Sequence, residues 1–92
     1  MPRYVIERDI PGVGTLSADE LHDVSVKSNS VLADMAPRAQ WVQSFVTDDK
    51  IYCIYLAQDE QAVREHARGG GFPADSVATV RAVIDPTTGD SR

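Results

Sequence analysis

The sequence predicts an α+β domain in which two helices cover one face of a four-stranded antiparallel sheet. Helix-like and strand-like segments follow one another in the order β-α-β-β-α-β, and the two middle strand-like runs are joined only by residues 48–50. A connection this short favours an antiparallel hairpin. The order of elements is that of the ferredoxin-like fold, whose helices both lie on one face of the sheet. The other face is left open.

The first half of the chain contains a strand and a long helix. Residues 3–9 are rich in β-branched and aromatic side chains, and a turn with Gly and Pro follows them. Ser17 and Glu20 have the spacing of a capping box, so the helix is expected to begin there, and Pro37 ends it. The apolar face of this helix, interrupted by Ser28, consists of Leu21, Val24, Val31, Leu32 and Met35.

The second half is expected to contain strands over residues 40–47, 51–56 and 77–84. Asp59 is placed to cap the second helix. The glycine run 69–71 ends that helix, because glycine has a low helix propensity and permits a positive φ. The apolar side of the second helix consists of Ala62, Val63 and Ala67.

Residues 1–84 are expected to form one domain, since the chain of 92 residues has room for a single small core. The apolar pattern then stops, so the tail 85–92 is expected to be loosely ordered. One cysteine, Cys53, excludes an internal disulfide and an all-thiolate metal site within one chain. Because one small core gives limited stability, association with a second copy is expected to help.

Side chains alternate between the two faces of a strand, and this alternation predicts the composition of the open face. The residues expected to face the helices are Tyr4, Ile6, Val42, Val46, Ile54, Leu56, Val80 and Ile84. The open face is then expected to carry Val5, Glu7, Trp41, Gln43, Phe45, Cys53, Tyr55, Thr79 and Arg81. A face this apolar marks an interface or a ligand groove. Two copies stacked through their open sheet faces would bury it.

Charge and hydropathy narrow the class of partner. Fourteen acidic against nine basic residues give a net charge of −5, which disfavours nucleic acid and anionic membrane surfaces. No apolar run approaches the roughly 18 residues of a membrane span, and residues 1–9 lack the apolar stretch of a signal peptide. We therefore expect a cytoplasmic protein without nucleic-acid or membrane partners.

The two histidines are the candidate metal ligands. His22 has Asp19 one helical turn earlier and Asp23 beside it, and Ni²⁺ or Zn²⁺ accepts imidazole and carboxylate ligands. A solvated helix face is the alternative interpretation. His66 follows Glu65 near the end of the second helix, where it could instead cap terminal carbonyl groups. A metal at His66 would need ligands from another element or subunit.

A third group of polar residues is expected to meet on the open sheet face: Glu7, Gln43, Cys53, Tyr55 and Arg81. An ion pair between Glu7 and Arg81 is the simpler interpretation. The functional interpretation is a small polar pocket within an apolar groove. No Ser-His-Asp arrangement can be argued, so no catalytic residue is assigned.

Several stretches resemble a small bacterial family long labelled only as a domain of unknown function. They are residues 6–12, 40–56, 64–68, 70–74 and 83–88. A described member is an actinobacterial nickel-binding protein, a ferredoxin-like dimer thought to sequester or detoxify nickel. The resemblance implies the same fold, a homodimer and a nickel ion, with no organic cofactor. It also places Gln43 where relatives usually carry histidine, and Phe45 where they often carry tyrosine.

The sequence therefore favours a homodimer that binds nickel or a similar divalent ion and is not an enzyme. The alternative is a small enzyme or small-molecule-binding module that uses the open sheet face. A dimeric structural or regulatory partner without a ligand is a third hypothesis. Because glutamine does not titrate, Gln43 cannot act as a general base, and we expect the open face to be chemically inactive.

Overall fold

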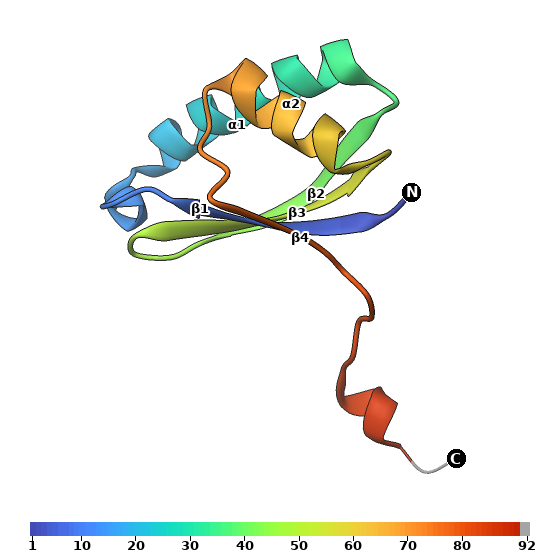
Figure 1. Cartoon of the computed structure of the whole chain (residues 1–92). Coiled ribbons are helices and arrows are strands. Elements are labelled where there is room, and N and C mark those ends of the chain that lie inside the picture. Colours follow the sequence, from blue (N-terminus) through green and yellow to red (C-terminus); the bar gives the residue numbers. More distant parts are fainter. Residues whose placement is uncertain (91–92) are drawn as a thin grey trace.

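The computed structural model describes residues 1–90, and its elements follow the predicted order (Figure 1). The strands are β1 (Arg3–Asp9), β2 (Ala39–Val46), β3 (Lys50–Ala57) and β4 (Ser76–Thr79). The helices are α1 (Ala18–Met35) and α2 (Glu60–Gly70), and short 3-10 helices lie at Val13–Thr15 and Pro86–Gly89. The strand order β2-β3-β1-β4 is antiparallel throughout, with both helices on one face, so the fold is ferredoxin-like. None of the helices within the described part of the chain is long and apolar enough to cross a membrane.

The helix ends lie where local signals predict them. The Ser17 side chain accepts from the Glu20 backbone N–H at 3.1 Å, and the Glu20 carboxylate accepts from the Ser17 N–H at 3.0 Å. The hydrogen bond from the Ser17 backbone N–H lowers the pKa of Glu20. Asp59 caps α2 by accepting from the Ala62 N–H at 2.8 Å, and α2 ends at Gly71, whose φ is 71°. The capping box, the Asp59 cap and the glycine stop are confirmed.

The core lies between the sheet and the two helices. Alternate residues of β1 and β3 face the helices and are buried: Tyr4, Ile6, Arg8, Ile51, Cys53, Tyr55 and Ala57. The predicted apolar side of α2 is confirmed, because Ala62, Val63 and Ala67 are all buried. From α1, Met35 is buried and Val31 and Leu32 pack partly against the core.

The faces of β3 are the reverse of the prediction. Cys53 and Tyr55 face the helices, whereas Ile54 and Leu56 alternate with them and lie on the open face. The residues of this strand are apolar on both faces, so their hydropathy does not alternate. It therefore cannot indicate which side chains face the helices. The prediction that Cys53 and Tyr55 lie on the open face is therefore wrong.

A β-bulge changes the faces of β2. Trp41 pairs with Tyr55 and Gln43 pairs with Ile54, so Val42 is skipped in the ladder. The bulge places both Trp41 and Ser44 on the helix side, where the Trp41 indole N–H donates to Ser44 Oγ at 2.8 Å. A strict two-residue period cannot anticipate the extra residue. The prediction was thus wrong for Trp41 and Val42, while Gln43 and Phe45 do lie on the open face.

β4 ends at Thr79 instead of reaching Ile84. The Val80 N–H donates to the Arg3 carbonyl at 2.8 Å, and Arg3 is the first residue of β1, so the neighbouring strand ends where β4 ends. Thr79 pairs with Tyr4 and so lies on the helix side, contrary to the prediction. The chain then leaves the sheet (Figure 1), and Arg81 and Ile84 lie outside it.

The segment after β4 has local structure of its own. The Asp85 carboxylate accepts from the Thr87 N–H at 2.9 Å, and the Thr88 hydroxyl accepts from the Asp85 N–H at 3.0 Å. These bonds belong to a second capping box, and the hydrogen bonds that the Thr87 hydroxyl and backbone N–H donate to the Asp85 carboxylate lower its pKa. Part of the predicted loose tail is therefore a short 3-10 helix, and residues 91–92 of that tail lie outside the described residues.

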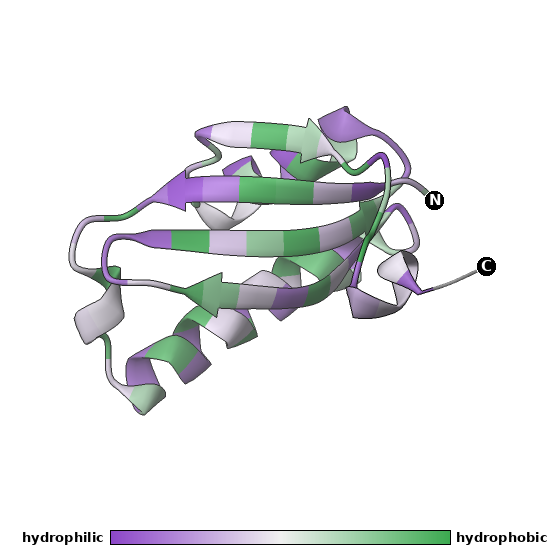
Figure 2. Cartoon of the chain, turned by 90° about the horizontal axis from the view of Figure 1, so that it is seen from below, coloured by the Kyte–Doolittle hydropathy of each residue, from purple (hydrophilic) through white to green (hydrophobic). Residues whose placement is uncertain are grey.

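Neither α1 nor α2 lies over the face of the sheet that is turned away from them (Figure 2). Phe45 and Val42 are 53% and 48% exposed on β2. Half-buried apolar side chains of the two central strands continue this surface: Val5, Tyr52, Ile54 and Leu56. We call these six residues the open-face patch. Its apolar character was predicted, although its membership was only partly so.

Candidate functional site

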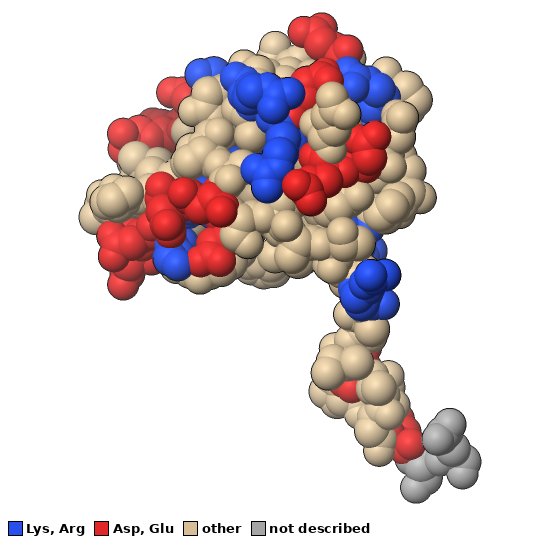
Figure 3. Space-filling model, viewed as in Figure 1, with Lys and Arg blue, Asp and Glu red and all other residues tan. Residues whose placement is uncertain are grey.

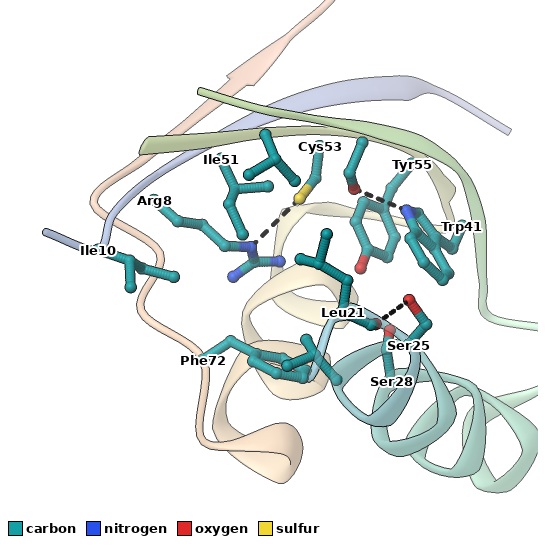
Figure 4. Close-up of a pocket in the computed structure, with 13 residues that line it drawn as sticks. Arg8, Ile10, Leu21, Ser25, Ser28, Trp41, Ile51, Cys53, Tyr55 and Phe72 are labelled. Carbon is teal, nitrogen blue, oxygen red and sulfur yellow. Dashed lines mark hydrogen bonds between the residues drawn. The ribbon is translucent and has the colours of Figure 1, made fainter. Parts of the chain in front are cut away.

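A cavity of about 180 Å³ lies on the helix side of the sheet, under α1 (Figure 4). Strands β1, β2 and β3, helix α1 and Phe72, which follows α2, contribute its walls. Its apolar lining residues are Ile10, Leu21, Val24, Trp41, Val46, Ile51 and Phe72. Three serine hydroxyls, from Ser25, Ser28 and Ser44, also reach it. This cavity lies on the face of the sheet opposite to the one where the sequence predicts a pocket.

The predicted polar group on the open face is divided between several places. Cys53 and Tyr55 line the cavity, and burial raises the pKa of Tyr55. Glu7 stays on the open face but forms its ion pair with Lys50, not with Arg81. The hydrogen bond to Glu7 and the charge of Asp9 raise the pKa of Lys50. Gln43 stays on the open face and neither lines the cavity nor takes part in the ion pair of Glu7.

Arg8 is the feature of the cavity that the sequence analysis missed. It is 3% exposed, and it is the one charged side chain among the described residues that line the cavity. Its Nε donates to Cys53 Sγ at 3.4 Å and its Nη1 donates to the Pro73 carbonyl oxygen. The guanidinium carbon lies 5.6 Å from the centre of the Phe72 ring. All of these partners are uncharged.

His66 lies beside the cavity and is fully buried. Its Nε2 forms a hydrogen bond with Ser28 Oγ at 3.1 Å. The serine that interrupts the apolar face of α1 is therefore the partner of the buried imidazole. The ring contacts Tyr55 and Phe72, with centroid distances of 5.1 and 5.8 Å. Burial, and then the charge of Arg8, lower the pKa of His66 below its ordinary value of 6.5. His66 is therefore neutral at pH 7.

The lowered pKa of His66 makes folding sensitive to acid. Between its folded-state pKa and 6.5 the unfolded chain binds more protons, so we expect the free energy of unfolding to fall as the pH drops below about 6.5. Thermal unfolding of the wild type and of His66→Gln at pH 7.5, 6.5 and 5.5 measures this. The variant should be less stable at pH 7.5 but should show a shallower dependence on pH. Equal slopes in the two proteins would contradict the assignment to His66.

The predicted metal ligands are not brought together within one chain. His22, Asp19 and Asp23 are exposed on α1, whereas His66 is buried and is no surface ligand. Glu65 pairs through both oxygens with Arg38, at 2.6 and 3.1 Å, which lowers the pKa of Glu65. Over residues 1–90, no three His, Cys, Asp or Glu side chains are placed to hold a metal ion. A site at His66 and Glu65 does not fit this structure.

The charged side chains over the helices are mixed in sign. Figure 3 shows basic groups beside acidic ones on this side of the molecule. Two ion pairs contribute, Arg38 with Glu65 and Arg64 with Glu60, and both are largely solvated. Exposed pairs of this kind contribute roughly 0–1 kcal/mol, so they are a surface feature and not a functional cluster.

The fold and the cavity together define a small ferredoxin-like α+β domain with a cavity under its first helix. The chain belongs to the family described as nickel responsive protein SCO4226-like, which matches residues 4–80. This confirms the resemblance found in the sequence. The crystal structure of SCO4226 from Streptomyces coelicolor A3(2) is similar, with a TM-score of 0.75 and 19% identity over 89% of this chain and 99% of that one. At this identity the likeness shows the fold. No curated protein matches the chain.

Proposed function

We propose that this protein binds Ni²⁺ and thereby sequesters or detoxifies the metal. The support is its membership of a family described as nickel responsive, over residues 4–80. One imidazole of the chain is accessible for this role, because His22 is exposed on α1 and His66 is buried. The exposed carboxylates of Asp19 and Asp23 lie beside His22 on the same helix. Binding, not catalysis, is the proposed activity.

The donor types suit the ion. Ni²⁺ accepts imidazole nitrogen and carboxylate oxygen, and its intrinsic affinity for such ligands exceeds that of Mn²⁺ or Co²⁺. Since no cluster of three such side chains exists over residues 1–90, one chain offers an incomplete ligand set. Water or donors of a second copy would complete it. The open-face patch supports a homodimer, because pairing through this face would remove Phe45 and its neighbours from water.

Replacing His22 tests the proposed ligand. We expect His22→Ala to weaken Ni²⁺ binding about tenfold or more, because the single accessible imidazole is lost. Asp19→Asn should weaken it less, since an amide oxygen remains in place of the carboxylate. Calorimetric titration of metal-stripped protein with Ni²⁺, Zn²⁺, Co²⁺ and Cu²⁺ measures the affinities and the ion preference.

The second histidine supplies the control. His66→Gln removes a buried imidazole and should leave Ni²⁺ affinity within about twofold of the wild type, although it lowers stability. An unchanged affinity in His22→Ala, or a large loss in His66→Gln alone, would show that the proposed ligands are wrong.

A further inference from the structure

We propose that the cavity under α1 binds a small monocarboxylic acid with an apolar body, whose carboxylate pairs with Arg8. This inference is separate from nickel binding, because none of the proposed metal ligands lines the cavity. It rests on a buried cation without a counter-charge, on the neutrality of the other polar groups, and on the apolar walls.

The guanidinium of Arg8 has donors left over. Nε and Nη1 donate to a thiol and a carbonyl group, but Nη2 is buried and has no hydrogen-bond partner among residues 1–90. Within the same described range, no aspartate or glutamate forms an ion pair with Arg8. Removing a charge from water without an opposite charge is costly, and arginine is almost never buried unpaired. A bound anion would provide the missing partner.

Because the described lining of the cavity contains one positive charge, the ligand that matches it best is an anion with one negative charge. Arg8 is the one cation among the described lining residues, and the neighbouring His66 is neutral. The serine hydroxyls are partly engaged already: Ser44 accepts from Trp41 at 2.8 Å and Ser25 donates to the Leu21 carbonyl at 2.9 Å. A phosphate dianion would keep one charge uncompensated in this space. A carboxylate matches the single charge and the planar fork of the guanidinium.

Because the rest of the cavity wall is mostly apolar, the rest of the ligand should be apolar as well. Leu21, Ile51, Trp41 and Phe72 surround the space, and Figure 4 shows Arg8 extending between the sheet and Phe72 toward it. About 180 Å³ is several times the roughly 30 Å³ that one water occupies in the liquid. Val24 lines the cavity and is 38% exposed, so the cavity reaches the surface beside it. A small acid could enter there with its apolar part against the side chains.

Matched probes separate the carboxylate from the apolar body. Benzoate, benzyl alcohol and inorganic phosphate are titrated into the metal-free full-length protein. Trp41, the single tryptophan, lines the cavity and reports binding by its fluorescence. We expect saturable binding of benzoate, at least tenfold weaker binding of benzyl alcohol, and no response to phosphate. Equal affinities for benzoate and its alcohol, or a preference for phosphate, would overturn the proposal.

Variants locate the charge. Arg8→Met should weaken benzoate binding at least tenfold while leaving the weak binding of benzyl alcohol unchanged. Arg64→Met removes an exposed arginine of α2 and should change neither affinity. Arg8 is buried, so its replacement can impair folding, and Val24→Phe at the cavity mouth is therefore the second test. This variant should weaken the binding of both benzoate and benzyl alcohol. Unaltered benzoate affinity in Val24→Phe, or in a folded Arg8→Met, would contradict the assigned site.

Discussion

Replacing Tyr55 with alanine is expected to remove about 3–5 kcal/mol from the free energy of unfolding, as for other buried aromatic side chains. Tyr55 is 2% exposed on the helix side of β3, where it contacts the ring of His66 and lines the cavity. For a domain whose total stability is about 5–15 kcal/mol, such a loss leaves a marginal fold. Chemical denaturation followed by far-UV circular dichroism measures it.

Tyr52→Ala is the matched control, because it removes the same side chain from the other face of the same strand. Tyr52 is half-buried among the open-face patch. At one low protein concentration, which holds any contribution of self-association constant, its replacement should cost less than half as much. A larger loss for Tyr52→Ala than for Tyr55→Ala would mean that the two faces of β3 are reversed.

A charge in the open-face patch is expected to separate the proposed dimer. Phe45 is 53% exposed on the edge strand β2, and burying each large apolar side chain contributes roughly 1.5–3 kcal/mol. Phe45→Glu would instead remove a charged carboxylate from water in that interface, which is costly. In sedimentation velocity at about 20 μM we therefore expect the wild type to be dimeric and the variant to be monomeric.

The control for this experiment is another apolar residue on a different surface. Val26 is 52% exposed on α1, so Val26→Glu introduces the same charge away from the patch and should stay dimeric. A monomeric wild type would refute the dimer, and dissociation by Val26→Glu would move the interface to the helices.

The element order and the helix ends could be predicted because they depend on local signals. Ser17 with Glu20 and Asp59 with Ala62 form bonds between residues three apart, and Gly71 adopts a positive φ. Because all the residues of such a pattern are close together in the sequence, the pattern can be recognised without the structure. The end of β4 is different, since it depends on the start of β1 at Arg3, which is far away in the chain and is connected to β4 only by the sheet pairing.

For the hairpin strands β2 and β3, the sequence predicts only in part which side chains lie on which face of the sheet. In β3 the apolar side chains are continuous, so no alternation separates Tyr55 from Ile54. In β2 the skipped residue Val42 reverses the alternation halfway along the strand. Because of these two errors, Trp41, Cys53 and Tyr55 were predicted on the open face, whereas they line the cavity on the helix side.

One signal for the real cavity was present in the sequence. Arg8 lies two residues after Ile6, and four after Tyr4, so the two-residue period places it on the helix side with them. An arginine at a core position of a strand indicates a buried charge that needs a partner. His66 had a similar signal, because it follows Ala62 by four residues and Val63 by three and so shares the buried side of α2, whereas its partner Ser28, 38 residues earlier, could not be predicted.

The central claim is that this chain binds nickel through an accessible imidazole. Its most direct test is a calorimetric titration of the metal-stripped wild type with Ni²⁺ at pH 7.5 and at pH 5.5. Protons compete with the metal for a neutral imidazole ligand, so we predict saturable binding at pH 7.5 that is much weaker at pH 5.5. The absence of binding at millimolar Ni²⁺, or an affinity that does not change with pH, would contradict the account.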